Sequence, residues 1–137
     1  MANEWTAVDL YGANNDGGKR RFTIADGLSV SKGQLLILSD PRTVTAVTMS
    51  AVPQMYAGVA SEEHKANLGV TSIAVWTDGI FEAVASGAIN AGSYITGADQ
   101  NKVIASGGLI VSSGANLIGY SFELAADAET INVRLDL

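Results

Sequence analysis

One stretch of alternating apolar and polar residues, at positions 69–97, constrains the fold of this chain more than any other part of the sequence. Within it, residues 73–76 and 80–84 place β-branched and aromatic side chains at the spacing of β-strands. Asp78 and Gly79 lie between these two runs, and an Asp-Gly pair readily adopts the positive φ angles of a tight hairpin turn. We therefore predict a β-hairpin that reverses at residues 77–79.

The same pattern of short strand candidates and turns continues over the chain from residue 28 onward. Turn residues separate the candidates at intervals of about 8 to 12 residues, as in β-sandwiches and β-barrels. The only stretch with helix start and stop signals is 61–68. We predict an all-β fold, a compact antiparallel β-barrel or sandwich with short hairpins and at most one short helix. The predicted strands are 34–39, 43–48, 54–60, 70–77, 80–85, 93–96, 102–105, 117–125 and 130–137.

Two Gly-containing turns resemble each other and indicate a repeated β architecture. Residues 25–33 lead into an apolar run in the same way that residues 85–92 lead into Tyr94 and Ile95. Similar corners would then recur around one core. Since Gly, Ser and Ala turns also look alike by chance, chance similarity is the alternative.

Length and composition indicate a single folded domain. The chain has 137 residues, within the usual size of about 100 to 200 residues per domain. Hydrophobic residues make up 47% of the chain and charged residues 16%, so it is too apolar and too weakly charged to remain disordered. We expect one β domain at residues 28–137.

The first 27 residues are expected to form an N-terminal arm and a flexible elbow, because residues 12–18 are rich in Gly, Asn and Asp. Trp5, Leu10 and Tyr11 are apolar enough to anchor this arm on a surface of the protein or of a partner. Trp76, in contrast, lies in a strongly patterned strand and is expected in the core. Trp5 is therefore the tryptophan that we expect to contact a partner.

The chain is acidic, with a net charge of −6 from 8 Lys and Arg against 14 Asp and Glu. An acidic chain lacks the positive surface that non-specific nucleic-acid binding needs, so we expect no nucleic-acid partner. Residues 1–21 are neutral and include the basic triplet Lys19, Arg20 and Arg21. The triplet can pair at short range with an acidic surface of another subunit. In the alternative interpretation it is a solvated flank of a loop.

Targeting and redox signals are lacking in the sequence. There is no cysteine, which rules out a disulfide framework and thiol chemistry. No apolar run approaches the roughly 20 residues of a membrane-spanning helix, and the first residues do not resemble a secretory signal. We expect no membrane partner.

Groups suited to catalysis or metal binding are scarce. His64 is the only histidine; it stands in the polar run 62–65, away from any candidate nucleophile, and is expected to be solvated. No second His and no Cys exist to complete a zinc site. Residues 13–20 fail the P-loop pattern because Arg20 stands where the Mg²⁺-binding hydroxyl is required. We predict a protein that is not an enzyme and has no metal site and no cofactor.

Five short motifs of strands and turns lie at residues 58–60, 73–83, 89–95, 117–120 and 130–135. Together they resemble the capsid decoration, or cement, proteins of tailed bacteriophages, with the resemblance extending over residues 28–137. The resemblance implies a small, non-enzymatic all-β protein, usually a homotrimer, that binds the outside of an expanded phage head and stabilises the capsid lattice. Its partner would be the major capsid protein, and its location the outer capsid surface of the virion, after synthesis in the host cytoplasm. Candidate capsid or partner contacts in this chain are Trp5, Leu10, Tyr11, Lys19, Arg20 and Arg21.

Two other functions stay open at the level of sequence. One is a receptor- or glycan-binding module of a phage fibre or a cell surface, which needs exposed aromatic side chains along a groove; its candidates are Tyr56, Tyr94 and Tyr120. The other is a small β-barrel enzyme that uses ordinary carboxylates. Its candidates are Asp78, Glu82 and Asp99.

Overall fold

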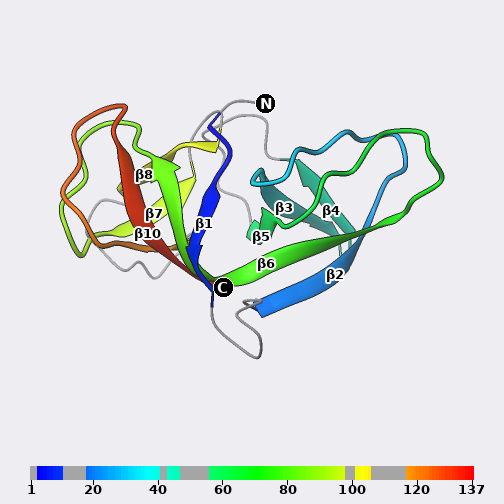
Figure 1. Ribbon diagram of the computed structural model, residues 1–137, viewed down its shortest axis with the longest axis horizontal. Helices are drawn as coiled ribbons and strands as arrows, with labels where there is room; N and C mark the ends of the chain where they lie inside the picture. The colour runs from blue at the N-terminus through cyan, green and yellow to red at the C-terminus, as the bar shows by residue number, and fades with distance from the viewer. Residues whose placement is uncertain (1–2, 11–17, 41–42, 47–55, 98–100, 106–116) are drawn as a thin grey trace.

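The computed structural model describes residues 3–10, 18–40, 43–46, 56–97, 101–105 and 117–137 (Figure 1). These residues form a ten-stranded, largely antiparallel sheet with no α-helix, which confirms the all-β class. Accordingly, the described residues include no helix long and apolar enough to cross a membrane. The strands are β1 (Thr6–Asp9), β2 (Gly18–Ile24), β3 (Leu35–Asp40), β4 (Thr43–Ala46), β5 (Tyr56–Ala60), β6 (Ser72–Val84), β7 (Tyr94–Gly97), β8 (Val103–Ala105), β9 (Gly119–Ser121) and β10 (Thr130–Asp136).

The longest strand, β6, continues through the residues expected to form a hairpin turn. Its first half pairs with β2 and its second half with β10, both antiparallel. The Asp78 carboxylate accepts a hydrogen bond from the Gly79 amide at 2.8 Å and forms an ion pair with Arg134 at 3.2 Å. The hairpin predicted at 77–79 is therefore wrong, because backbone pairing along both halves of β6 outweighs the local turn preference of Asp-Gly.

β6 connects two lobes, which we call the first lobe (residues 18–77) and the second lobe (residues 78–137) (Figure 1). In the first lobe the pairings run from β6 to β2, β4, β3, β5 and back to β6, which closes a small barrel-like circuit. In the second lobe they run from β6 to β10, β9, β7 and β8. Val103 of β8 then bridges Ala85, directly after β6, in parallel orientation, just as β4 pairs with β2 in parallel in the first lobe.

The two similar turns seen in the sequence occupy equivalent places in the two lobes. The first turn leads to a bridge between Val30 and His64, and the second to a bridge between Ile89 and Ala125. In both bridges each amide donates to the carbonyl of the other residue, at 2.8–2.9 Å in the first lobe and 2.8–3.0 Å in the second. The similarity between the turns is therefore structural, and each lobe repeats the same corner.

Within residues 1–27, the residues that the structure describes belong to the sheet instead of forming the separate arm that the sequence predicts. β1 and β2 lie along the same edge of β6, opposite residues 80–82 and 72–78. Trp5 is only 3% exposed, and its indole N–H donates to the Asn101 carbonyl at 2.9 Å. Burying an indole whose donor is satisfied stabilises the fold more than leaving it in water. Tyr11 and most of the predicted elbow lie outside the described residues.

Successive side chains of β6 point into two different cores. Ile73 and Val75 pack in a core inside the first lobe, while Trp76, Phe81 and Ala83 belong to a larger core that includes most of the second lobe. The Phe81 ring lies 5.8 Å from that of Trp5 and 5.3 Å from that of Trp76, measured between ring centroids. Trp76 is thus a core residue as predicted, and Trp5 joins it at the junction of the lobes.

The predicted helix at 61–68 is replaced by turns and the bridge at His64. The backbone of this segment finds its partners outside the segment: the Ser61 amide donates to the Ala74 carbonyl at 3.0 Å and the Asn67 amide to the Asp26 carbonyl at 2.7 Å. Because the Asn67 amide is bonded to Asp26, it is unavailable for the bond to the Glu63 carbonyl that a helix over 61–68 would need.

Candidate binding surface

The basic triplet lies in β2, where the alternation of side chains separates its members. Phe22 packs against the core of the first lobe, so Arg20 points to that side of the strand. Lys19 and Arg21 point to the opposite side. All three are exposed, so the structure brings the predicted charges to the surface but divides them between two faces.

Lys19 shares its face with Lys32 and Trp76. Lys19 is opposite Trp76 in the β2–β6 pairing, and the Nζ atoms of both lysines lie 5.8 Å from the centroid of the indole ring. This distance is within the range of cation–π attraction. Within the described ranges neither lysine has an ion-pair partner. Two positive charges from separate elements are therefore held above one aromatic ring.

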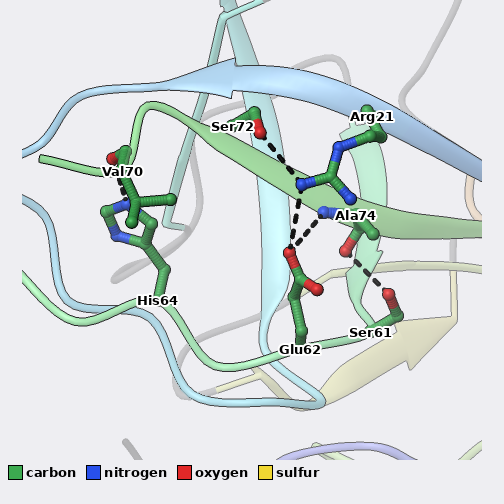
Figure 2. Close-up of polar contacts among 7 residues, drawn as sticks. All are labelled: Arg21, Ser61, Glu62, His64, Val70, Ser72 and Ala74. Atoms are coloured by element: carbon green, nitrogen blue, oxygen red, sulfur yellow. Dashed lines mark hydrogen bonds and ion pairs between the residues drawn. The ribbon is translucent and has the colours of Figure 1, made fainter.

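Arg21 is held in place by neighbouring polar groups (Figure 2). Its Nη2 donates to the Ser72 hydroxyl at 2.9 Å and lies 3.7 Å from the Glu62 carboxylate. The same Glu62 oxygen accepts a hydrogen bond from the Ala74 amide at 3.2 Å. Since both members of the ion pair are largely exposed, its contribution to stability is small, but Glu62 compensates part of the Arg21 charge.

His64 is buried, and both nitrogen atoms of its ring lie against backbone carbonyl oxygens. It is 3% exposed, and its Nδ1 atom lies 2.7 Å from the Leu28 carbonyl oxygen. Its Nε2 atom lies 2.7 Å from the Val70 carbonyl oxygen (Figure 2). The prediction of a solvated His64 is wrong, because the turn that precedes Val30 places the Leu28 carbonyl on one side of the ring and the connection before β6 places the Val70 carbonyl on the other. With both nitrogens engaged, the ring is not available as a base or a metal ligand.

A shallow hollow of about 290 Å³ lies beside this turn. Its walls combine acidic, basic and apolar side chains, and Leu68, one of them, is 67% exposed. Because the ring nitrogens of His64 face backbone carbonyls, no proton-transfer group points into the hollow from that residue. The lining residues are Glu62, Glu63, His64, Lys65, Leu68, Val70 and Ser72.

The carboxylates considered for an enzymatic site are not gathered into one. Asp78 is paired with Arg134, and Glu82 is exposed on the second half of β6; Asp99 lies outside the described residues. Across the described part of the chain, no three His, Cys, Asp or Glu side chains are grouped so that they could hold a metal ion.

Aromatic side chains that are far apart in the sequence meet on the second lobe. Tyr94 and Tyr120 are directly opposite each other on β7 and β9. The ring of Phe122 lies 5.3 Å from that of Tyr120 at an interplanar angle of 76°, an edge-to-face contact. No pattern in the sequence indicates this cluster, because only the pairing of β7 with β9 brings the two tyrosines together.

Tyr56 reaches from the first lobe to the second. Burial raises the pKa of its hydroxyl, an effect that hydrogen bonds from the Thr96 side chain and the Gly97 backbone partly oppose. Tyr56 packs against the larger core, so of the three tyrosines suggested for a binding groove it is the one that serves packing.

The other predicted contact residues that the structure describes are not exposed together with the basic triplet. Trp5 is a core residue, and Leu10 is half-buried and packs against the same core. Tyr11 lies outside the described residues. The described contact candidates that remain exposed are therefore Lys19, Arg20 and Arg21.

Charge is divided unequally between the lobes. Residues 18–77 hold six basic and four acidic residues, a net charge of +2. Residues 78–137 hold two basic and seven acidic residues, a net charge of −5. The molecule therefore presents a basic lobe and an acidic lobe.

The model of one protein family, described as phage cement protein, matches residues 15–137. The chain belongs to the phage cement protein family. The match extends from just before β2 to the end of the chain, so it covers both lobes and the basic triplet. Membership makes the chain a structural component of a phage virion and implies that it binds a phage capsid.

The fold of this cement-family chain is similar to the crystal structure of the N base of head fiber gp8.5 in bacteriophage phi29. The TM-score is 0.53 at 15% sequence identity, over 87% of this chain and 95% of the other. At this identity the likeness concerns the fold. None of the curated proteins compared with the chain matches it.

Proposed function

We propose that this chain is a capsid decoration protein that binds the outer surface of a phage head and stabilises the capsid lattice. Its role is structural rather than catalytic, it acts as a homotrimer, and its partner is the major capsid protein. The observation that carries the proposal is the cement-family match over residues 15–137. The acidic overall charge supports a protein partner rather than a nucleic acid.

Arg20, on one side of β2, is proposed to contact the capsid together with Tyr11, and Lys19 and Arg21, on the other side of the strand, are proposed to contact a neighbouring copy of the chain. Lys19, Arg20 and Arg21 supply positive charge on both sides of one rigid strand. Each copy of a symmetric oligomer would repeat the same contact on a repeated lattice, so individually weak contacts add up to tight binding. Trp5 and Leu10 contribute indirectly, by holding β1 against β6.

The proposal is tested by co-sedimentation of the protein with undecorated phage heads. We expect the wild type to pellet with heads up to a saturating ratio, and Arg20→Glu to pellet less, with the difference shrinking at high salt. Lys65→Glu makes the same change of charge elsewhere on the first lobe and serves as the control, expected to pellet like the wild type. A wild type that never pellets with heads would overturn the proposal. Equal pelleting of Arg20→Glu would remove Arg20 from the contact.

A further inference from the structure

The second lobe carries an outer face on which aromatic rings remain exposed. Tyr94 is 40% exposed and Phe122 is 43% exposed. Tyr120 is opposite Tyr94 in the sheet and in ring contact with Phe122. Aromatic side chains gathered on one surface are typical of the buried centre of protein interfaces.

Acidic side chains share this face. Val133 and Leu135 point into the core, so Arg134 and Asp136 of β10 point outward, on the side of Tyr120, which is opposite Arg134. Opposite β10 on β6, the same outward side carries Asp78 and Glu82, of which Asp78 is paired with Arg134. We call Tyr94, Tyr120, Phe122, Asp78, Glu82 and Asp136 the acidic face.

The first lobe carries a face of opposite charge. Lys19 and Lys32 stand above the Trp76 ring and Arg21 is on the same side of β2; we call these four residues the basic face. Neither ammonium group has an ion-pair partner among the described residues, so a carboxylate brought close to either one would be attracted. The basic face therefore fits a partner surface that presents acidic side chains.

We propose that the basic face of one copy of the chain binds the acidic face of the next copy. The net charges of +2 and −5 on the two lobes make the faces complementary, and the exposed rings supply apolar area at the contact. Because the two faces lie on different lobes, the contact is head-to-tail, and such contacts form a ring when the rotation between copies closes. The inference rests on the self-association in the proposed function and names the surfaces that make it.

The test is a charge exchange between the two faces, read as molar mass in solution without phage heads. Lys19→Glu/Lys32→Glu makes both faces acidic, and Glu82→Lys/Asp136→Lys makes both faces basic. Neither Glu82 nor Asp136 uses its side chain in an ion pair or side-chain hydrogen bond with another described residue. We expect an oligomer for the wild type and a dissociation constant raised by about tenfold or more for each variant alone. A single chain that carries all four substitutions has complementary faces at every contact of a ring of any size, so it should associate again.

Lys65→Glu, a charge reversal outside both faces, is the control and should associate like the wild type. Circular dichroism and the thermal midpoint show whether each variant remains folded. A wild type that is monomeric, two-residue variants that associate as well as the wild type, or a four-residue variant that stays dissociated would each overturn the inference. So would a monomeric wild type that binds a sugar on a glycan array and loses this binding in Tyr94→Ala, since the face would then serve carbohydrate. A protein that pellets with phage heads but is monomeric in solution would overturn the inference and leave the capsid-binding proposal standing.

Discussion

The two lobes build the same corner with different side chains. In the first lobe the corner is the bridge between Val30 and His64, and in the second it is the bridge between Ile89 and Ala125. The His64 ring contacts carbonyls on both sides, whereas the methyl group of Ala125 has no atom that can do so. Backbone pairing therefore defines the corner, while the side chain at its centre differs with the connection that follows it.

That connection differs in length between the lobes. In the first lobe residues 65–71 separate the corner from β6, and in the second lobe residues 126–129 separate it from β10. The longer connection brings the Val70 carbonyl over the histidine ring. A polar side chain is thus tolerated in a buried position because the extra backbone satisfies it.

Substitution of one turn glycine in each lobe is expected to give the largest difference in stability between the lobes. Gly33 and Gly92 occupy matching turns with φ angles of 90° and 82°. A Cβ atom at Gly33 would collide with the Trp5 carbonyl oxygen, while one at Gly92 has no atom within 4 Å. Gly33→Ala should therefore lower the free energy of unfolding by about 3 kcal/mol, and Gly92→Ala by about 1 kcal/mol. Urea denaturation of both variants measures the difference, and equal losses would show that Trp5 is not held against the turn.

Replacing His64 by alanine, the residue found at the matching position 125 of the second lobe, is expected to have the next largest effect on stability. His64→Ala leaves the Leu28 and Val70 carbonyls without the ring and should lower the free energy of unfolding by about 2 kcal/mol. Hydrogen exchange locates the loss: the Val30 amide should exchange faster, while the Ile89 amide should keep its protection. Full protection of Val30 in this variant would mean that the ring does not stabilise the corner.

A smaller effect on stability is expected at the residue with a positive φ angle that ends each corner. Asn67 and Ala128 occupy equivalent positions with φ angles of 64° and 69°. Asparagine tolerates this conformation better than alanine, so Ala128→Asn should raise the free energy of unfolding by about 0.5 kcal/mol and Asn67→Ala should lower it by a similar amount. Thermal unfolding of the two variants compares them directly. A loss of stability in Ala128→Asn would show that the two corners do not end alike.

The smallest effect on stability is expected from Tyr56, which connects the lobes, and it is measurable only at alkaline pH. The raised pKa of Tyr56 keeps its hydroxyl protonated in the folded state at pH values where an unfolded tyrosine, with a pKa near about 10, loses its proton. Unfolding then releases a proton, so this contribution to stability is present below about pH 10 and is lost as the pH rises further. Denaturation midpoints should fall more steeply above pH 10 for the wild type than for Tyr56→Phe. Identical slopes would contradict the raised pKa.

Prediction from sequence succeeded where the signal is local and failed where distant partners decide. The strand candidates at 34–39, 93–96 and 130–137 correspond to β3, β7 and β10, because alternation and β-branched residues are local properties. The hairpin at 77–79 failed because strands far away in the chain pair with both halves of β6. The candidate site followed the same division: the basic triplet is exposed as the sequence indicated, whereas Trp5 is buried by contacts with Gly33 and Asn101.

Residue types and their spacing along the chain were enough to predict the all-β class, the core position of Trp76, the basic triplet and the resemblance to phage cement proteins. These properties follow from strand propensity, burial and charge, which are local. The pairing of distant strands was needed to find that β6 joins two lobes with matching corners, that His64 is buried between two carbonyls, and that Tyr94 meets Tyr120 on an acidic face. These features depend on which strands pair, and pairing is decided by the free energy of the whole sheet rather than by any one segment.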